Sequence, residues 1–237
     1  MKKTTVSLCI LLLASAAFAA AVESNFGDFS GAPLPDEQQK VLGMSPAKAF
    51  ASGGFKVMGG LAMGNLNISA TVPSWAKKTA KMGFMGGVGY ESGGQIAYEV
   101  DLLYSPGGAV FKPTDTASKM RLEYAATAVT LPIMLKVRFL RGTTPYALAG
   151  GEIGYILKEK VIYTSTTGVV DTEDVTDNIS RLLYGLVFGG GMELPLGRVN
   201  LLLEARYRLG LSNQLKDPPA GHYVKATVLS FTVGARF

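Results

Sequence analysis

The chain has 237 residues, of which 23 are Lys or Arg and 18 are Asp or Glu, giving a formal net charge of +5. This cationic excess is small and no run of Lys or Arg concentrates it, so we expect no nucleic-acid partner. The single cysteine is Cys9. The chain after Cys9 therefore cannot form disulfides, use a thiolate in catalysis or bind a metal through cysteine.

Residues 1–19 have the pattern of a secretory signal peptide. Lys2 and Lys3 form a charged start, an apolar stretch follows at 6–13, and residues 17–19 read Ala-Phe-Ala, a small-x-small cleavage site. We expect cleavage after residue 19, with Ala21 as the second choice; a transmembrane anchor is the alternative. Removing the two lysines leaves 21 basic against 18 acidic residues, a net charge of +3.

Residues 20–52 lack periodicity and are rich in Pro, Gly, Ser and Ala, with Pro33 and Pro35 in the middle. This composition predicts an irregular periplasmic segment with one helical turn near 36–42. A plug that enters the lumen is the alternative.

Strict alternation begins after residue 53 and is clearest at 200–209, Asn-Leu-Leu-Leu-Glu-Ala-Arg-Tyr-Arg-Leu. Leu203 and Tyr207 lie on its apolar face, and Glu204 and Arg206 on the other. Eight such segments follow one another, each as long as the roughly 9 to 11 tilted residues that cross a bilayer. They are 54–65, 82–90, 95–104, 122–140, 144–157, 182–194, 200–209 and 224–237.

The gaps between these segments alternate between long and short. Long gaps at one end and tight turns at the other are typical of outer-membrane barrels, whose periplasmic turns are short and external loops long. The sequence therefore predicts an eight-stranded antiparallel up-and-down transmembrane β-barrel over residues 53–237, in the bacterial outer membrane. The long gaps are 66–81, 105–121, 158–181 and 212–223; the short ones are 91–94, 141–143 and 195–198.

The apolar faces must meet lipid, so the charged faces line the lumen. Five acids stand against six bases there, close to balance. Pro132 also points inward in this register and predicts a bulge. The lumen set is Lys56, Glu99, Asp101, Lys136, Arg138, Glu152, Glu193, Glu204, Arg206, Arg208 and Arg236.

Aromatic residues gather at strand ends, as in the girdles at the two interfaces of a membrane barrel. Ordinary β-propensity of aromatic residues is the alternative. One girdle would hold Phe55, Tyr90, Tyr98, Phe139 and Phe237; the other would hold Trp75, Tyr104, Tyr155, Tyr184 and Tyr207.

From residue 53 to the end the chain resembles the PorT-like and OmpA-like group of small outer-membrane barrel proteins. The resemblance rests on the motifs at 131–139, 145–150, 205–213 and 233–237. It implies that the terminal Phe237, with Ala235 and Val233 alternating before it, is the signal read by the barrel-assembly machinery. A plain edge residue of the last strand is the alternative, and both can hold.

Candidate chemistry is sparse, and we expect no enzyme, no cofactor and no metal. His222 is the only histidine, with Asp217 and Tyr223 nearby and Ser212 ten residues back, but no compact His-x-Ser pattern appears. The acidic run 171–177 lacks the central glycine of an EF-hand calcium loop, so a solvated loop is expected. The glycines at 86–87 and 189–191 lie within strands, where they leave room for long lumen side chains.

An eight-stranded barrel has an interior just wide enough for side chains. The sequence therefore predicts a structural or binding barrel that acts through its external loops, with a ligand that the residues do not identify. A narrow channel, or an enzyme acting on lipid A or peptides through His222, is the alternative.

Overall fold

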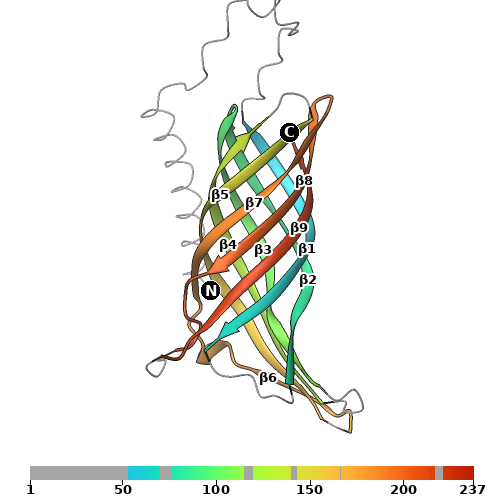
Figure 1. Cartoon of the computed structure of the whole chain (residues 1–237), viewed down its shortest axis with the longest axis vertical. Helices are drawn as coiled ribbons and strands as arrows, with labels where there is room; N and C mark the ends of the chain where they lie inside the picture. Colours follow the sequence, from blue (N-terminus) through green and yellow to red (C-terminus); the bar gives the residue numbers. More distant parts are fainter. Residues whose placement is uncertain (1–52, 70–75, 115–119, 140–142, 166, 217–220) are drawn as a thin grey trace, which may run out of the picture.

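The computed structural model describes residues 53–69, 76–114, 120–139, 143–165, 167–216 and 221–237. The predicted signal peptide, the segment 20–52 with its helical turn, and Trp75 lie outside these ranges. Within them the chain forms nine strands and one short 3-10 helix (Figure 1). They are β1 Gly54–Ile68, β2 Ala76–Gly93, β3 Ile96–Pro113, β4 Arg121–Arg138, β5 Thr144–Thr164, β6 Val170–Asp174, η1 Thr176–Asn178, β7 Leu182–Leu196, β8 Val199–Gly210 and β9 Val224–Arg236.

Eight strands close into a ring of antiparallel neighbours, in the order β4-β3-β2-β1-β9-β8-β7-β5, with β4 and β5 also paired. The first and last strands join over a continuous register from Lys56–Arg236 to Ile68–Val224. The predicted up-and-down arrangement of eight strands is confirmed for the ring. The ninth strand, β6, was not predicted; it pairs only with the far end of β5 and stands outside the ring.

The ring has two different ends. Short connections join the strands at one end of the ring, which we call the turn end and which is uppermost in Figure 1. The C-terminus lies at the same end. At the opposite end, β2 to β6 project beyond the ring as a sheet that we call the extension. It comprises residues 76–81, 105–113, 121–127 and 158–164 together with β6.

The extension corrects the predicted loop boundaries. Residues 76–81, 105–113 and 158–164 were assigned to long loops, yet they continue β2, β3 and β5. These stretches lack the apolar alternation of the wall because water, not lipid, can contact them. The turn predicted at 91–94 is also too long, since β2 runs to Gly93.

Alternate side chains face outward along the ring strands, as predicted. In β8, Leu203 and Tyr207 are 40% and 46% exposed, whereas Glu204 and Arg206 are buried. All nine described aromatics of the two predicted girdles are exposed. Across the residues that the structure describes, no helix combines the length and apolar composition needed to cross a bilayer.

The bulge predicted at Pro132 is wrong. Pro132 is buried, as expected, but the register between β4 and its neighbours stays constant around it, and the shift against β5 falls at Thr127/Ala128 instead. Proline lacks the N–H that a ladder needs, and the β3–β4 pairing is interrupted between Val100–Ile133 and Leu103–Thr130. The strand therefore accommodates the proline by losing a hydrogen bond rather than by adding a residue.

An ion-paired lumen as the candidate functional site

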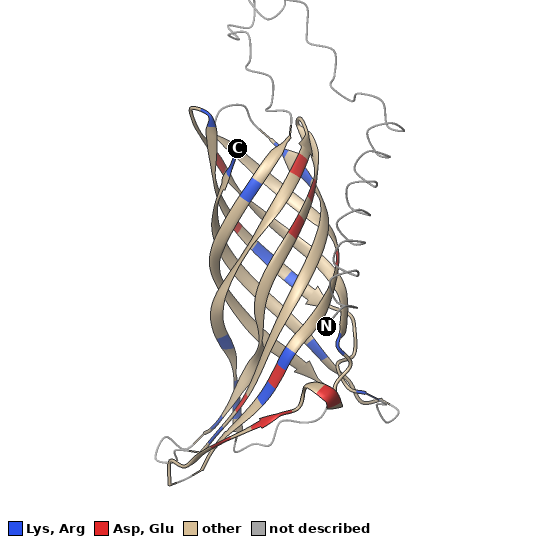
Figure 2. Cartoon of the chain, turned by 180° about the vertical axis from the view of Figure 1, so that it is seen from behind, with Lys and Arg blue, Asp and Glu red and all other residues tan. Residues whose placement is uncertain are grey.

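The predicted lumen residues lie inside the ring, brought there by the alternation of the strands. Ten of the eleven are buried; Arg208, with 14% of its side chain exposed, is the least enclosed. Figure 2 shows charged residues along the barrel wall and a second concentration on the extension. Distances divide the lumen set into two clusters and one further pair.

The turn-side cluster consists of Glu91, Lys136, Arg138, Glu193 and Arg236. Arg138 and Arg236 each pair with both Glu91 and Glu193, and the Arg138 Nε–Glu193 Oε2 distance is 3.0 Å. The Lys136 ammonium lies 2.8 Å from Glu91 and 3.9 Å from Glu193. Two acids and three bases therefore close the lumen near its turn end.

The central cluster consists of Lys56, Glu99, Asp101, Glu204 and Arg206. Arg206 holds Glu99 and Asp101 at 2.7 Å each and also pairs with Glu204. Lys56 pairs with Glu99 and lies 2.9 Å from Asp101. This cluster has three acids and two bases, so it offsets the charge excess of the turn-side cluster.

Lys136 joins the two clusters. Its ammonium is 3.6 Å from Glu99 and stacks 3.9 Å from the centre of the Tyr146 ring. The Tyr146 hydroxyl in turn donates a hydrogen bond of 2.9 Å to Glu204. The two clusters are thus one continuous buried polar network.

Beyond the network the lumen becomes largely apolar. Arg208 pairs with Glu152 at 3.2 Å and donates to the Ser105 hydroxyl. A cavity of about 20 Å³ lies beside this pair, room for about one water molecule. Its apolar lining includes Met85, Leu103, Pro132, Val187 and Val228.

Glu91 is the site residue that the sequence analysis missed. Its side chain is fully buried and contacts three cations. With Glu91 the lumen holds six acids and six bases, so its formal charge is zero. The signal was present: Tyr90 faces outward in β2, so the next residue had to face inward.

Glycines make room for this network. A Cβ on Gly89 would overlap the Asp101 carboxyl group and the Lys56 stem, and one on Gly191 would overlap Tyr146. The predicted role of the strand glycines, leaving lumen space for long side chains, fits Gly191. It does not fit Gly86 and Gly190, which pair with Tyr104 and Ala205 on the outward face.

A comparison with known protein families gives one match that covers well over half of the chain. The model of the outer membrane protein beta-barrel domain matches residues 48–216. The chain is a member of this outer-membrane barrel family. It resides in the bacterial outer membrane, and its exposed apolar wall meets the lipid bilayer.

Three solved structures are similar to this chain at low sequence identity. OprG of Pseudomonas aeruginosa is 11% identical and covers 80% of this chain and 98% of its own, with a TM-score of 0.44. Ail of Yersinia pestis is 16% identical over 78% and 99% of the two chains, with a TM-score of 0.40. The Neisserial surface protein A is 14% identical over 77% and 95%, with a TM-score of 0.38. No curated protein matches the sequence significantly.

The other candidate residues of this outer-membrane barrel differ in exposure. His222 is exposed, whereas Ser212 is buried and its hydroxyl accepts a hydrogen bond from the Tyr184 N–H. Asp217 lies outside the described residues. In the described part of the chain no group of three or more His, Cys, Asp or Glu is arranged to hold a metal ion.

Proposed function

We propose that this protein is a closed, non-conducting barrel that serves a structural or binding role through the extension. In this proposal the turn end faces the periplasm and the extension lies outside the cell. Support comes from the short connections at one end and the projecting sheet at the other.

The buried ion-pair network is the observation that carries the proposal. Six acids and six bases fill the lumen, and Lys136 connects the two clusters. Ions crossing this lumen would have to separate paired charges that are shielded from water, which is costly because each charge left behind would be buried alone.

Planar-bilayer recording tests this proposal. Folded protein, verified by heat-modifiable migration on gels, should insert without producing conductance steps, while a known porin in the same membrane conducts. Reproducible steps from the wild-type protein would refute the closed lumen and favour a narrow channel.

We also propose that Val233, Ala235 and Phe237 are recognised by the barrel-assembly machinery. Val233 in β9 and Phe237, which directly follows β9, are exposed at 53% and 65%. Phe237→Ala should slow insertion into proteoliposomes that contain the machinery but not spontaneous folding in detergent. Equal slowing in both systems would indicate a structural role alone.

A further inference from the structure

The extension is a sheet of five strands with two lateral edges, in the order β2-β3-β4-β5-β6. The β2 edge consists of residues 76–80. Because the β1–β2 ladder ends at Gly64–Lys81, this edge pairs only with β3 within the described ranges. The β6 edge, Val170–Asp174, pairs only with β5 in the same part of the chain, and all five of its residues are exposed. A strand edge with free N–H and C=O groups is a template for pairing with another strand.

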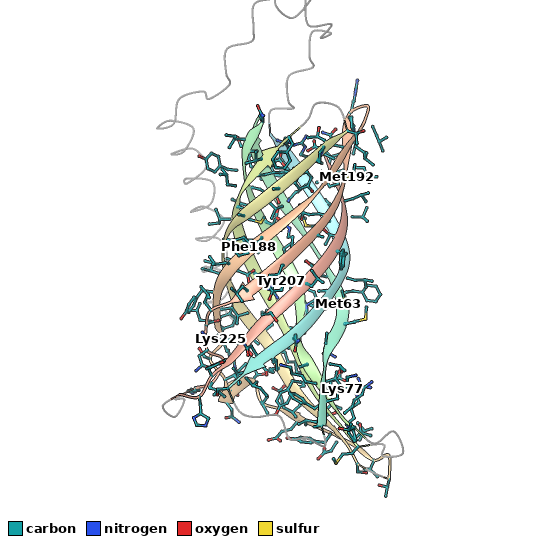
Figure 3. All side chains as sticks on the ribbon, viewed as in Figure 1. Met63, Lys77, Phe188, Met192, Tyr207 and Lys225 are labelled. Carbon is teal, nitrogen blue, oxygen red and sulfur yellow. The ribbon has the colours of Figure 1, made fainter. Side chains whose placement is uncertain are left out.

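The two edges carry opposite charges. Residues 76–81 read Ala-Lys-Lys-Thr-Ala-Lys and include no acid, whereas residues 170–174 read Val-Asp-Thr-Glu-Asp and include no base. Lys77 is exposed, and Figure 3 labels it on the projecting sheet. Opposite charges on neighbouring strands stabilise their pairing, and like charges oppose it.

Both faces of the sheet have a cation at one edge and an acid at the other. One rung runs through all five strands and consists of Lys78, Phe111, Leu122, Tyr163 and Asp171. Lys78 therefore shares a face with Asp171 and Glu173, while alternation puts Lys77 and Asp174 on the other face. A sheet that continued from the β6 edge of one molecule to the β2 edge of the next would match charges on both faces.

Strand direction also permits this junction. Every ladder of the extension is antiparallel, so β2 and β6 run in the same direction. Two molecules that stand the same way up in one membrane therefore bring β6 and β2 together as a parallel pair. Joining two β2 edges, or two β6 edges, would instead place like charges opposite each other. The charges thus select the mixed pair.

We propose that the β6 edge binds the β2 edge of a second copy of this chain by adding one strand to the other. This inference rests on the proposed role of the extension as the binding part of the molecule, and it names the partner. Backbone hydrogen bonds hold such a junction, and the side chains give it selectivity. Because each molecule keeps one free edge of each kind, the contact is head-to-tail and builds a ring or a row.

A charge swap tests the junction. The acidic variant combines Lys77→Glu with Lys78→Glu, and the basic variant combines Asp171→Lys with Glu173→Lys, so each variant alone has two edges of the same sign. The measurement is energy transfer between copies in one vesicle, labelled at Arg198→Cys in the exposed turn between β7 and β8. Wild type should exceed the level of random encounters, and each variant alone should fall to that level.

Mixing the two variants decides the outcome, because every junction between an acidic and a basic copy again joins opposite charges. The mixture should recover the energy transfer that each variant lost, which a merely misfolded variant could not do. Random-level transfer in wild type, undiminished transfer in either variant alone, or no recovery in the mixture would overturn the proposal.

Disulfide trapping provides a second measurement on otherwise unchanged edges. Cys9, in the predicted signal peptide, is the only cysteine, so introduced cysteines are unambiguous. Mixing Thr79→Cys, on the β2 edge, with Thr172→Cys, on the β6 edge, should give a linked dimer on mild oxidation in vesicles. Thr79→Cys mixed with Arg198→Cys is the matched control and should not. Equal linkage in the control, or from Thr79→Cys alone, would contradict the mixed junction. Conductance by the wild type would refute the closed lumen but would not alter these results.

Discussion

Glu91 has three cationic partners in the lumen, as Glu99 and Glu193 also have. It lies between Lys136, Arg138 and Arg236, which come from two strands of the ring, and its side chain is fully buried. Removing one partner of a buried ion pair lowers the stability of the fold by more than the intact pair contributes to it, because the remaining charge stays buried without a partner.

Glu91→Gln should therefore destabilise the folded barrel by about 3 to 5 kcal/mol, measured by urea unfolding in vesicles. Asp177→Asn is the control, since Asp177 pairs with Arg181 but has 92% of its side chain exposed. That variant should change stability by about 0 to 1 kcal/mol. Adding Arg236→Gln to Glu91→Gln should recover part of the loss. Equal effects of Glu91→Gln and Asp177→Asn would contradict the assigned role.

Glu159 in the extension should make the stability of the fold depend on pH. It is 6% exposed, one of its oxygens accepts no hydrogen bond within the described part of the chain, and burial raises its pKa above 4.5. The folded state therefore holds this proton more tightly than the unfolded state, which favours folding at low pH.

Stability from Glu159 should be fully present below pH 4.5 and should be lost as the pH rises through the raised pKa. Glu159→Gln should remove this loss and stabilise the protein at neutral pH. The measurement is the difference in unfolding free energy between wild type and variant across pH. A difference that does not change with pH would show that Glu159 is not protonated preferentially in the fold.

At the scale of the strand, β8 tests which face meets lipid. Leu203 lies outward in mid-strand and Tyr207 outward near the extension end. Leu203→Arg should lower the free energy of unfolding by about 2 to 4 kcal/mol, because it places a charge in the hydrocarbon. Tyr207→Arg lies nearer the interface, so the same effect should lower the free energy of unfolding by only about 0 to 1 kcal/mol. Unfolding in vesicles measures both.

Leu202→Arg places the same charge in the lumen, beside Glu193 in the ladder. Its effect should be insensitive to bilayer thickness, because Leu202 does not contact lipid, whereas the cost of Leu203→Arg should grow in thicker bilayers. Matching responses from Leu202→Arg and Leu203→Arg would mean that the register is wrong.

A pair of glycines tests the space in the lumen. Gly89→Ala should destabilise, since the added methyl group overlaps Asp101 and Lys56. Gly59→Ala is the control, because its methyl group would meet only the Met85 carbonyl at an ordinary 3.8 Å. Thermal unfolding should separate the two variants by more than about 1 kcal/mol, the usual cost of overpacking a core. Similar unfolding midpoints for Gly89→Ala and Gly59→Ala would show that the lumen side chains can move to make room for the methyl group at little cost in stability.

Periodicity predicted the ring strands because lipid on one side and charge on the other enforce strict alternation. It failed in the extension, where segments such as Ser105–Pro113 hold Pro106, Gly107 and Gly108 in place of alternating apolar residues. The same argument explains the candidate site. Eleven lumen residues follow from alternation, whereas Glu91 was lost to a turn boundary placed three residues too early.

At the scale of the whole molecule, which side chains pair could not be predicted from the sequence. Alternation indicates that Arg206 and Glu99 both face inward, but only the closed ring determines that they contact each other at 2.7 Å. Two clusters with opposite charge excess, joined through Lys136, arise from the relative shift of the strands around the ring. The near balance of the lumen was predictable; its division into two layers was not.

Ring closure by β1 and β9 also constrains the order of folding. Glu91 and Arg236 are 145 residues apart, and Glu99 and Arg206 are 107 apart. Neither contact can form until nearly the entire polypeptide has been synthesised and exported. Such distant pairings slow folding. The unfolded chain therefore has to cross the periplasm with these distant groups hydrated and unmatched, and Glu91 meets Arg236, and Glu99 meets Arg206, only when the ring closes.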